Sequence, residues 1–228
     1  MIKKTFVISL GGSIIVPQGG IDVNFLKRFK KLVLEQVELG YKFIIITGGG
    51  TTAREYIKAG NKVSKMADND SDWMGIAATR LNARLIQSIF GPVADSNIII
   101  DPTMKVDSGK KVVIGAGYKP GRTTDYVAIL CAKNAKADVV INLSNIDYVC
   151  DKDPGKYKDA KPLEKMTWKE FKDIVGDKHS PGMNAPFDPI ASKLAAKEKT
   201  EVVIVNGRKI DNVRKYLEGE KFKGTVIS

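Results

Sequence analysis

The chain has 228 residues, of which 43% are hydrophobic and 28% charged, a composition typical of a globular protein with a well-buried core. Two cysteines without a CxxC pair and a single histidine, His179, all but exclude the usual zinc sites, and no apolar run has the length of a membrane span. The net charge of +11 favours an anionic partner, and we expect a small anion rather than a nucleic acid because the lysines stand among acids and no aromatic–basic platform recurs.

Apolar runs rich in β-branched residues predict a series of strands. In chain order these runs are 5–10, 42–47, 97–100, 111–115, 138–143, 201–205 and a short one at 225–227. Most of them are continuous rather than alternating with polar residues, which is typical of strands that are covered on both faces of a sheet.

Helical patterns separate several of these strands. They cover 23–39 with Asp22 as the candidate N-cap, 73–90, 124–135, a short helix after Thr167 that ends at Gly176, and 212–217. Thr167 and Glu170 form a capping-box pattern, and the polar segment 151–165 reads as a loop. The alternation of strand and helix predicts an α/β fold with a mainly parallel sheet and helices on both faces, in one compact domain with two lobes.

Glycines follow three of the predicted strands. The clusters are Gly11-Gly12 before Ser13, the run 48–50, and Gly115, Gly117 and Gly121. Parallel sheets bind ligands beyond the carboxyl ends of their strands, and glycine lets backbone amides approach an anion there. One such turn can be purely structural, but three at the same edge indicate a polyphosphate site, and two of them lead into helices whose amino termini attract negative charge.

Two charged residues accompany these glycines. Arg54 follows the second cluster by about one helical turn, where its guanidinium can bind phosphate oxygens; the alternative is an ion pair with an acid on the helix surface. Asp72 stands at the start of the predicted helix 73–90, where it either caps the helix or accepts hydroxyls from a ribose. The glycine run matches neither the P-loop nor the dinucleotide fingerprint.

The segments LGGS, TGGGTTARE, DWMGIAATRLNA, KPGRTTD, NLSNIDYVCDKDP and DPIASK, in this order, resemble the uridylate (UMP) kinases of the amino-acid-kinase superfamily, and most closely the archaeal-type branch. The likeness covers nearly the whole chain. It implies a three-layer α/β/α sandwich in a single domain, 1–228, with an N-terminal lobe (about 1–120) for UMP and a C-terminal lobe (about 121–228) for ATP. It also implies a homo-oligomer, typically a hexamer. The low cysteine content favours a reducing cytosol, and the residues predict neither a nucleic-acid nor a membrane partner.

The resemblance also implies roles for individual residues. It puts Gly12 and Ser13 at the transferred phosphate, and Gly50 and Arg54 at the phosphates shared by donor and acceptor. For UMP it implies Gly49, with Asp72 on the ribose hydroxyls, and a wrapping segment made of Tyr118, Lys119, Pro120, Gly121, Arg122, Thr123 and Thr124. For the adenine nucleotide it implies Ser144, Asn145, Cys150 and Asp153.

Two positions depart from the pattern of the superfamily. Many members carry a lysine where this chain has Ser9, so a cation on the transferring phosphoryl group must come from elsewhere. Lys193 is the candidate, and a surface lysine on a helix is the alternative. Cys150 stands where relatives commonly carry an aromatic residue against the nucleotide, which puts ATP affinity and donor identity in question. We interpret its thiol as a packing group, because no neighbouring base would activate it.

The sequence leads to the hypothesis of direct in-line transfer of the ATP γ-phosphoryl group to a phosphate oxygen of UMP. That oxygen is already ionised, so catalysis needs no base and consists of positioning and charge neutralisation by glycine amides, Arg54, Lys193 and magnesium. Asp125 and Asp188 are candidates to orient Lys193 or to hold magnesium, although Asp125 is equally an ordinary first-turn acid. No set of protein side chains is predicted to hold a resident metal.

Other functions stay open at this stage. Another kinase of the same fold would act on isopentenyl phosphate, N-acetylglutamate or carbamate. No histidine lies in the 115–125 loop for the first, and Asp72 fits a nucleotide better than the other two. Ser9 and Cys150 also leave room for a non-catalytic binder of nucleotides or oxyanions, whereas a nucleic-acid-binding module rests only on the net charge.

Overall fold

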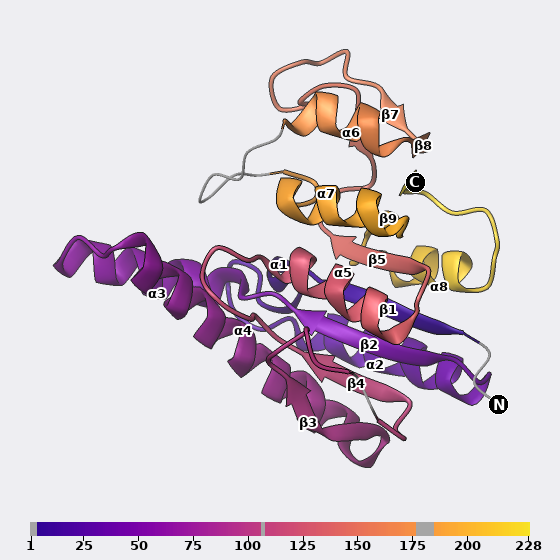
Figure 1. The fold of residues 1–228 in the computed structure, drawn as a ribbon, viewed down its shortest axis with the longest axis horizontal. Coiled ribbons are helices and arrows are strands. Elements are labelled where there is room, and N and C mark those ends of the chain that lie inside the picture. Colours follow the sequence, from indigo (N-terminus) through magenta and orange to yellow (C-terminus); the bar gives the residue numbers. More distant parts are fainter. Residues whose placement is uncertain (1–3, 106–107, 177–184) are drawn as a thin grey trace.

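The computed structural model describes residues 4–105, 108–176 and 185–228, and its central feature is an eight-stranded sheet (Figure 1). Its strands are β1 (Thr5–Leu10), β2 (Lys42–Thr47), β3 (Ala94–Ile99), β4 (Val112–Gly115), β5 (Val139–Ser144), β8 (Lys165–Met166), β9 (Glu201–Asn206) and β10 (Thr225–Ile227). They lie in the order β3-β4-β2-β1-β5-β9-β10-β8. Among the described strands of this sheet, neighbours from β3 to β9 are parallel, β9 and β10 are antiparallel, and β10 and β8 are parallel. The predicted mainly parallel sheet is confirmed.

Helices connect the strands and cover the sheet. They are α1 (Gly12–Ile15), α2 (Val23–Glu38), α3 (Gly50–Val63), α4 (Asp68–Phe90), α5 (Thr124–Ala135), α6 (Trp168–Val175), α7 (Pro189–Glu198) and α8 (Ile210–Leu217), with a 3-10 turn η1 at Gly91–Val93. A second sheet pairs β6 (Val149–Cys150) with β7 (Pro162–Leu163), so the ends of the predicted loop at 151–165 are joined as a small hairpin.

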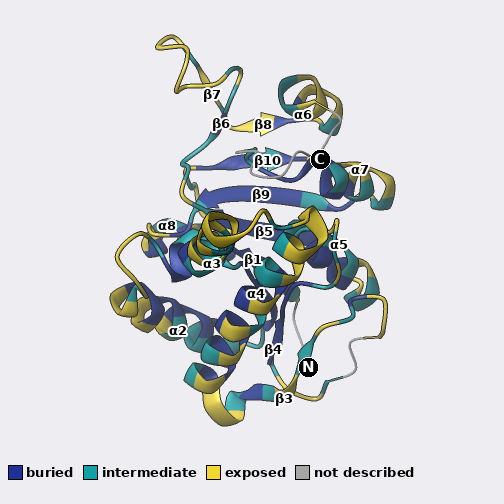
Figure 2. Ribbon diagram, turned by 90° about the vertical axis from the view of Figure 1, so that its left-hand side faces the viewer, coloured by how far each residue is buried: buried dark blue, intermediate teal, exposed yellow. Residues whose placement is uncertain are grey.

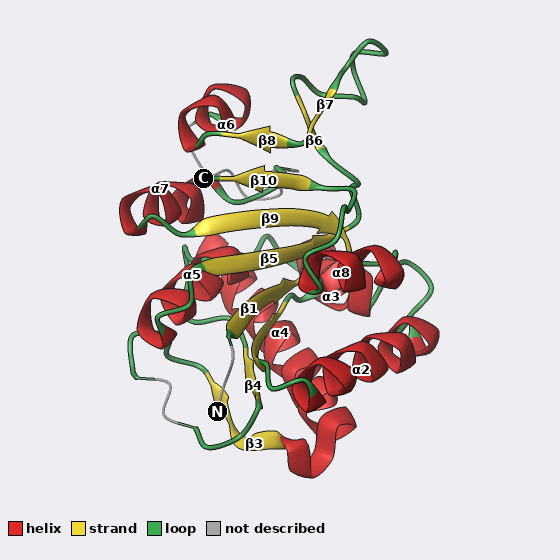
Figure 3. Cartoon of the chain, turned by 90° about the vertical axis from the view of Figure 1, so that its right-hand side faces the viewer, coloured by secondary structure: helices red, strands yellow, loops and turns green. Residues whose placement is uncertain are grey.

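Two apolar clusters on opposite faces of the sheet give the molecule three layers (Figure 3). One cluster packs α2, α4 and α8 against the sheet and buries Phe29 and Ile86. The other packs α5, α6 and α7 against the opposite face and buries Val127 and Phe171. Because successive side chains of a strand point to opposite faces, Val7 joins the second cluster while its neighbours in β1 join the first.

The edge strand β3 differs from the central strands. The middle residues of β3 are exposed, whereas β1 and β2 are buried apart from the half-buried Thr5, and Figure 2 shows the central strand β9 as mainly buried. The strand predicted at 97–100 begins earlier, at Ala94. An edge strand can pair with its neighbour, here β4, without a continuous apolar run, because it is not covered on both faces.

Two helix starts were wrong in the sequence-based prediction, and two caps were confirmed. Helix α4 begins at Asp68 rather than at residue 73, so Asp72 lies inside the helix and is not its cap. Acids are favoured in the first turn of a helix, which is why the polar stretch before residue 73 is helical. Asp22 caps α2 and Thr167 with Glu170 forms the capping box of α6 as predicted, and α8 begins two residues before its predicted start at 212.

Candidate functional site

The loops that follow the parallel strands meet at one edge of the sheet. The amide of Gly11, after β1, donates to the carbonyl of Leu143 in β5 at 3.0 Å. The amide of Gly48, after β2, donates to the carbonyl of Leu10 in β1 at 2.9 Å. These bonds hold the first two glycine clusters side by side at the carboxyl ends of the strands, which is where the sequence placed an anion site.

The first two glycine loops pack backbone against backbone. A Cβ atom added to Gly12 would lie 2.7 Å from the carbonyl carbon of Gly48 and 2.7 Å from the amide nitrogen of Gly49. Gly50 has a φ of 66°, which residues with a side chain rarely adopt. Glycine is therefore required at this junction, because a side chain would prevent the close approach of the two loops.

Helix α4 supports both this junction and the third glycine cluster from behind. The side-chain amide of Asn82 donates to the carbonyls of Gly48 (2.7 Å) and Gly49 (3.2 Å). The hydroxyl of Thr79 accepts a hydrogen bond from the amide of Gly117 at 2.8 Å. Both side chains are buried, and the sequence reasoning missed their roles. The available signal was a pair of polar residues, one turn apart, on a helix face that is mostly apolar.

Arg54 lies in the first turns of α3, next to the glycine loops. Its guanidinium donates to the hydroxyl of Thr51, one turn earlier, at 2.8 Å, and its side chain is exposed. Within the described ranges, no acid forms an ion pair with Arg54, so the surface-pair alternative is not supported there. The guanidinium is thus held beside the amino terminus of α3 by a neutral partner and keeps donors for an anion.

Asp72 is joined to the segment that was predicted to wrap UMP. The amide of Gly121 donates to Asp72 Oδ2 at 2.7 Å, and Gly121 has a φ of 72°. At the end of the same segment, the hydroxyl of Thr123 caps α5 by accepting from the amide of Tyr126 at 3.3 Å. The structure therefore brings Asp72 and the 118–124 segment together, although they lie in different predicted elements.

Asp125 links three elements beneath the loops. The hydroxyl of Ser9, in β1, donates to Asp125 Oδ1 at 2.8 Å, and the amide of Asp188, at the start of α7, donates to Asp125 Oδ2 at 3.2 Å. Burial raises the pKa of the Asp125 carboxyl to about 6, although both hydrogen bonds favour its ionised form. Asp125 is therefore more than an ordinary first-turn acid, and Ser9 is its partner.

The other two candidate catalytic residues belong to α7. Asp188 is the N-cap of this helix and accepts a hydrogen bond from the amide of Ala191 at 2.8 Å. Lys193 is the fifth residue of α7, and its side chain is exposed. The contact of Asp188 with Asp125 brings the start of α7 to the site, while the predicted contact of Lys193 with the transferring phosphoryl group stays a prediction.

The predicted adenine-nucleotide residues lie at the carboxyl end of β5 and in the hairpin that follows. Ser144 ends β5, Asn145 is exposed beside it, and Cys150 pairs with Pro162 in the hairpin. Burial raises the pKa of the Cys150 thiol, which agrees with a packing role rather than a reactive one. Asp153 Oδ1 accepts from the amide of Gly155 at 2.8 Å, so its predicted turn is confirmed, and its contact with a nucleotide stays a prediction.

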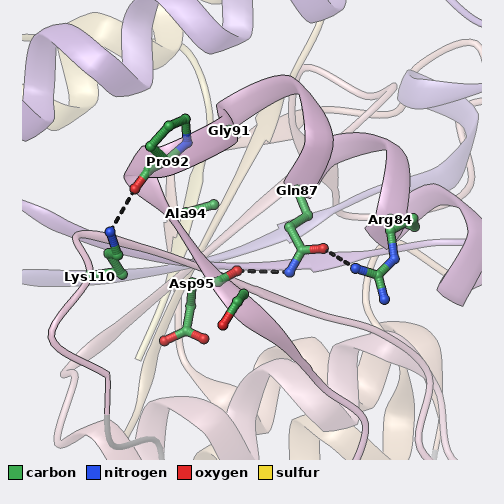
Figure 4. Close-up of a pocket in the computed structure, with 8 residues that line it drawn as sticks. Arg84, Gln87, Gly91, Pro92, Ala94, Asp95 and Lys110 are labelled. Atoms are coloured by element: carbon green, nitrogen blue, oxygen red, sulfur yellow. Dashed lines mark hydrogen bonds between the residues drawn. The ribbon is translucent and has the colours of Figure 1, made fainter.

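A pocket of about 430 Å³ lies away from this edge, at the start of β3 (Figure 4). There Gln87 donates to the carbonyl of Asp95 at 2.7 Å, Arg84 donates to Gln87 at 2.5 Å, and Lys110 donates to the carbonyl of Pro92 at 2.8 Å. Arg84, Gln87 and Lys110 thus each use a donor in a hydrogen bond within the protein. The pocket lies at the amino-terminal end of β3, whereas the glycine loops lie at the carboxyl ends of the strands.

Residues 4–105, 108–176 and 185–228 contain no group of three or more histidine, cysteine or acidic side chains that could hold a metal ion. His179 lies outside these ranges. Among the same residues, no helix combines the length and the apolar character that crossing a membrane requires.

Comparisons with known proteins agree with this geometry. The sequence pattern described as the amino acid kinase family matches residues 4–206. The chain is 36% identical over 227 residues to the uridylate kinase of Methanococcus vannielii, covering 97% of this chain and 98% of that protein. It is 33% identical over 227 residues to the uridylate kinase of Methanocaldococcus jannaschii, again covering 97% and 98%. The crystal structure of uridylate kinase from Archaeoglobus fulgidus superposes with a TM-score of 0.83 at 33% identity, covering 98% of this chain and 99% of that one.

Proposed function

The chain belongs to the amino acid kinase family, and we propose that it is a uridylate kinase that transfers the γ-phosphoryl group of ATP to UMP. The observation that carries this proposal is the junction of the two glycine loops, Gly12 against Gly48 and Gly49, at the carboxyl edge of the sheet. The acceptor residues Asp72 and 118–124 lie on one side of this junction, and the loop after β5 lies on the other. The full-length similarity to uridylate kinases supports the same assignment.

The glycine loops and Arg54 bind the phosphates of both nucleotides in this proposal. Amides of Gly12, Ser13, Gly49 and Gly50 donate to phosphate oxygens, and the guanidinium of Arg54 adds a charged, forked donor. These donors bring the two chains of phosphates into line and offset their mutual repulsion, which is the larger part of catalysis when the nucleophile is already ionised.

Asp72 and the segment from Tyr118 to Thr124 bind UMP in this proposal. A carboxylate oxygen can accept more than one hydrogen bond, so Asp72 can receive ribose hydroxyls while it still accepts from the amide of Gly121. The contact also fixes the position of the segment relative to α4. The members of the segment that face UMP are Tyr118, Lys119, Pro120, Gly121, Arg122, Thr123 and Thr124.

ATP lies on the C-terminal side of the junction, against Ser144, Asn145, Cys150 and Asp153. The proposal divides the chain into an N-terminal lobe of about residues 1–120, which binds UMP, and a C-terminal lobe of about 121–228, which binds ATP. Asp188 and Lys193 reach the site from α7, and Lys193 supplies the cation that the position of Ser9 lacks.

In this proposal magnesium binds together with the nucleotide. Asp125 already accepts hydrogen bonds on both carboxylate oxygens, and the described residues offer no group of three ligands, so phosphate oxygens and water would supply most of the coordination. Magnesium bound to the phosphates would neutralise part of their charge. Asp125 then acts as a positioning group that fixes the start of α7 relative to β1.

The proposal also includes the cellular compartment of the protein and its assembly. We expect the protein to act in the cytoplasm and to assemble as a homo-oligomer, with a hexamer as the specific expectation. Size-exclusion chromatography with light scattering tests the assembly, and a monomer at micromolar concentration would contradict it.

The activity is tested with purified protein, ATP, magnesium and a panel of acceptors, by following ADP release. We expect turnover with UMP that exceeds turnover with CMP, dUMP, isopentenyl phosphate, N-acetylglutamate and carbamate. Faster turnover with a non-nucleotide acceptor would assign the chain to another kinase of this fold. Binding of ATP without turnover on any acceptor would indicate a nucleotide-binding protein without catalysis.

A further inference from the structure

The loops that follow β5 and β9 are joined by a backbone hydrogen bond and by the side chains of Asp147, Asn206 and Lys209. The amide of Gly207 donates to the carbonyl of Ser144 at 2.9 Å. Asp147 lies three residues further along and accepts on both oxygens. The side-chain amide of Asn206 donates to Oδ1 at 3.0 Å, and the ammonium of Lys209 donates to Oδ2 at 2.7 Å.

Lys209 occupies an unusual position for a lysine. It is the N-cap of α8, where no side-chain hydrogen bond caps the helix. A cation at the amino terminus of a helix is unfavourable, and Ser, Thr, Asp or Asn is the usual cap. The carboxylate of Asp147, on a neighbouring loop, brings a negative charge to this helix end. The hydrogen bond from Lys209 also lowers the pKa of Asp147, so the pair is ionised at neutral pH.

The segment 144–150 is anchored at its other end as well. The amide of Val149 donates to the hydroxyl of Thr225 at 2.8 Å, and this hydroxyl donates to the carbonyl of Leu163 at 2.5 Å. Hydrogen bonds thus hold Ser144, Asp147 and Val149 in place. The remaining residues of the segment, 145, 146, 148 and 150, lie between or beside them. The residues expected to face the adenine nucleotide include Asn145 and Cys150, which lie next to these anchors.

We propose that Asp147 is a positioning residue for ATP, which holds the donor loop 144–150 in its binding conformation by tying it to Asn206 and Lys209. The inference rests on the proposed function in that it takes the ligand of this loop to be ATP. The pair is about half exposed, with 48% of the Lys209 side chain and 41% of the Asp147 side chain accessible. Ion pairs that are exposed to this extent add little to stability, so the contact matters for the shape of the loop rather than for the fold.

The first test is the variant Asp147→Asn, which keeps the size of the side chain and removes its charge. We expect the KM for ATP to rise about tenfold, the KM for UMP to stay unchanged, and the melting temperature to stay within about 2 °C. Lys209→Met should have a similar effect, and the double variant should be no worse than either single variant because both break the same contact.

A control lies at the C-terminal ends of α5 and α7, the helices that precede β5 and β9. Lys133 forms an ion pair with Glu198 at 2.8 Å, far from the loops. Glu198→Gln removes one charge from this pair and should leave both KM values unchanged. A rise in the KM for ATP of the control would show that any loss of an exposed charge has this effect, which would overturn the proposal.

Two further outcomes would contradict it. If Lys209→Met raised the KM for ATP while Asp147→Asn lowered it, Lys209 would bind ATP itself and Asp147 would compete with the nucleotide. If both KM values rose together, the contact would support the whole site rather than the donor loop.

Hydrogen exchange separates this inference from the proposed function. We expect amides in the 145–148 stretch of the ligand-free protein to exchange about tenfold faster in Asp147→Asn than in the unchanged chain. Unchanged exchange there would overturn the positioning role whatever the substrate. Faster exchange in a protein that did not bind ATP would instead leave the loop assignment in place and overturn the function.

Discussion

Ser9 donates a hydrogen bond of 2.8 Å to the carboxylate of Asp125 across 116 residues of sequence. The sequence identified Ser9 as the position where many members of the superfamily carry a lysine. In this chain a neutral hydroxyl takes that place and holds the carboxylate, which also accepts from the amide of Asp188. The departure at residue 9 is therefore matched by a contact that joins β1, α5 and α7 directly below the glycine loops.

Ser9→Ala removes one of the two donors to this carboxylate. A hydrogen bond to a charged group contributes about 1.5–3 kcal/mol, so we expect the free energy of unfolding to fall by that amount and kcat to fall with it. Urea unfolding and steady-state kinetics provide the two measurements. Ser9→Thr keeps the hydroxyl and should retain most of both quantities; equal losses in the two variants would mean that packing, not the hydrogen bond, matters at residue 9.

The pKa of Asp125 predicts how stability depends on pH. In the folded protein this pKa is raised from an ordinary value of 3.8 to about 6, so the folded chain binds a proton more readily than the unfolded chain. The contribution of Asp125 to stability should therefore decrease as the pH rises from about 4 to about 6, and stay constant above that range. Urea unfolding of the unchanged protein and of Asp125→Asn across pH 4–7 gives this contribution as a difference. A difference that does not change with pH would show that the carboxyl titrates normally.

Arg54→Ala should lower kcat by a factor of about 100 or more, because the guanidinium supplies charge to the phosphates during transfer. The melting temperature should not change, since this exposed side chain contacts only the hydroxyl of Thr51 among the bonds described. Arg54→Lys should recover little activity, because a lysine lacks the planar fork. Full activity of Arg54→Ala would remove this residue from the mechanism.

Asp72→Asn should raise the KM for UMP about tenfold and leave the KM for ATP unchanged. The variant weakens acceptance of ribose hydroxyls and of the amide of Gly121. Asp70→Asn, an acid in the first turn of the same helix, is the control and should change neither value. Since Asp72 is not the cap of α4, loss of helix stability without any change in KM would contradict the assigned role.

Much of the fold could be predicted because its signals are local. The continuous apolar runs of β1 and β2 report burial on both faces, and the glycines after them report close backbone approach. The start of α4 was missed because its first five residues are all polar and therefore carry no apolar periodicity. The edge strand β3 was placed too late for a related reason, since its exposed middle carries no apolar signal.

The supporting contacts of the site could not be predicted from local patterns. Ser9 and Asp125 are brought together only by the packing of α5 on β1, and Asp147 and Lys209 only by the parallel pairing of β5 and β9. Nothing in the residues beside them marks these partners. Asn82 has the clearest local signal, because a polar side chain on a buried helix face needs a hydrogen-bond partner.

The central claim is that backbone amides of the two glycine loops bind the phosphates of both nucleotides. A crystal structure of the protein with UMP and a non-hydrolysable ATP analogue tests it most directly. We predict phosphate oxygens within hydrogen-bonding distance of the amides of Gly12, Gly49 and Gly50, with the two chains of phosphates meeting between them. Phosphates bound at any other place, such as the pocket beside Arg84 and Lys110, with the glycine loops empty, would contradict it.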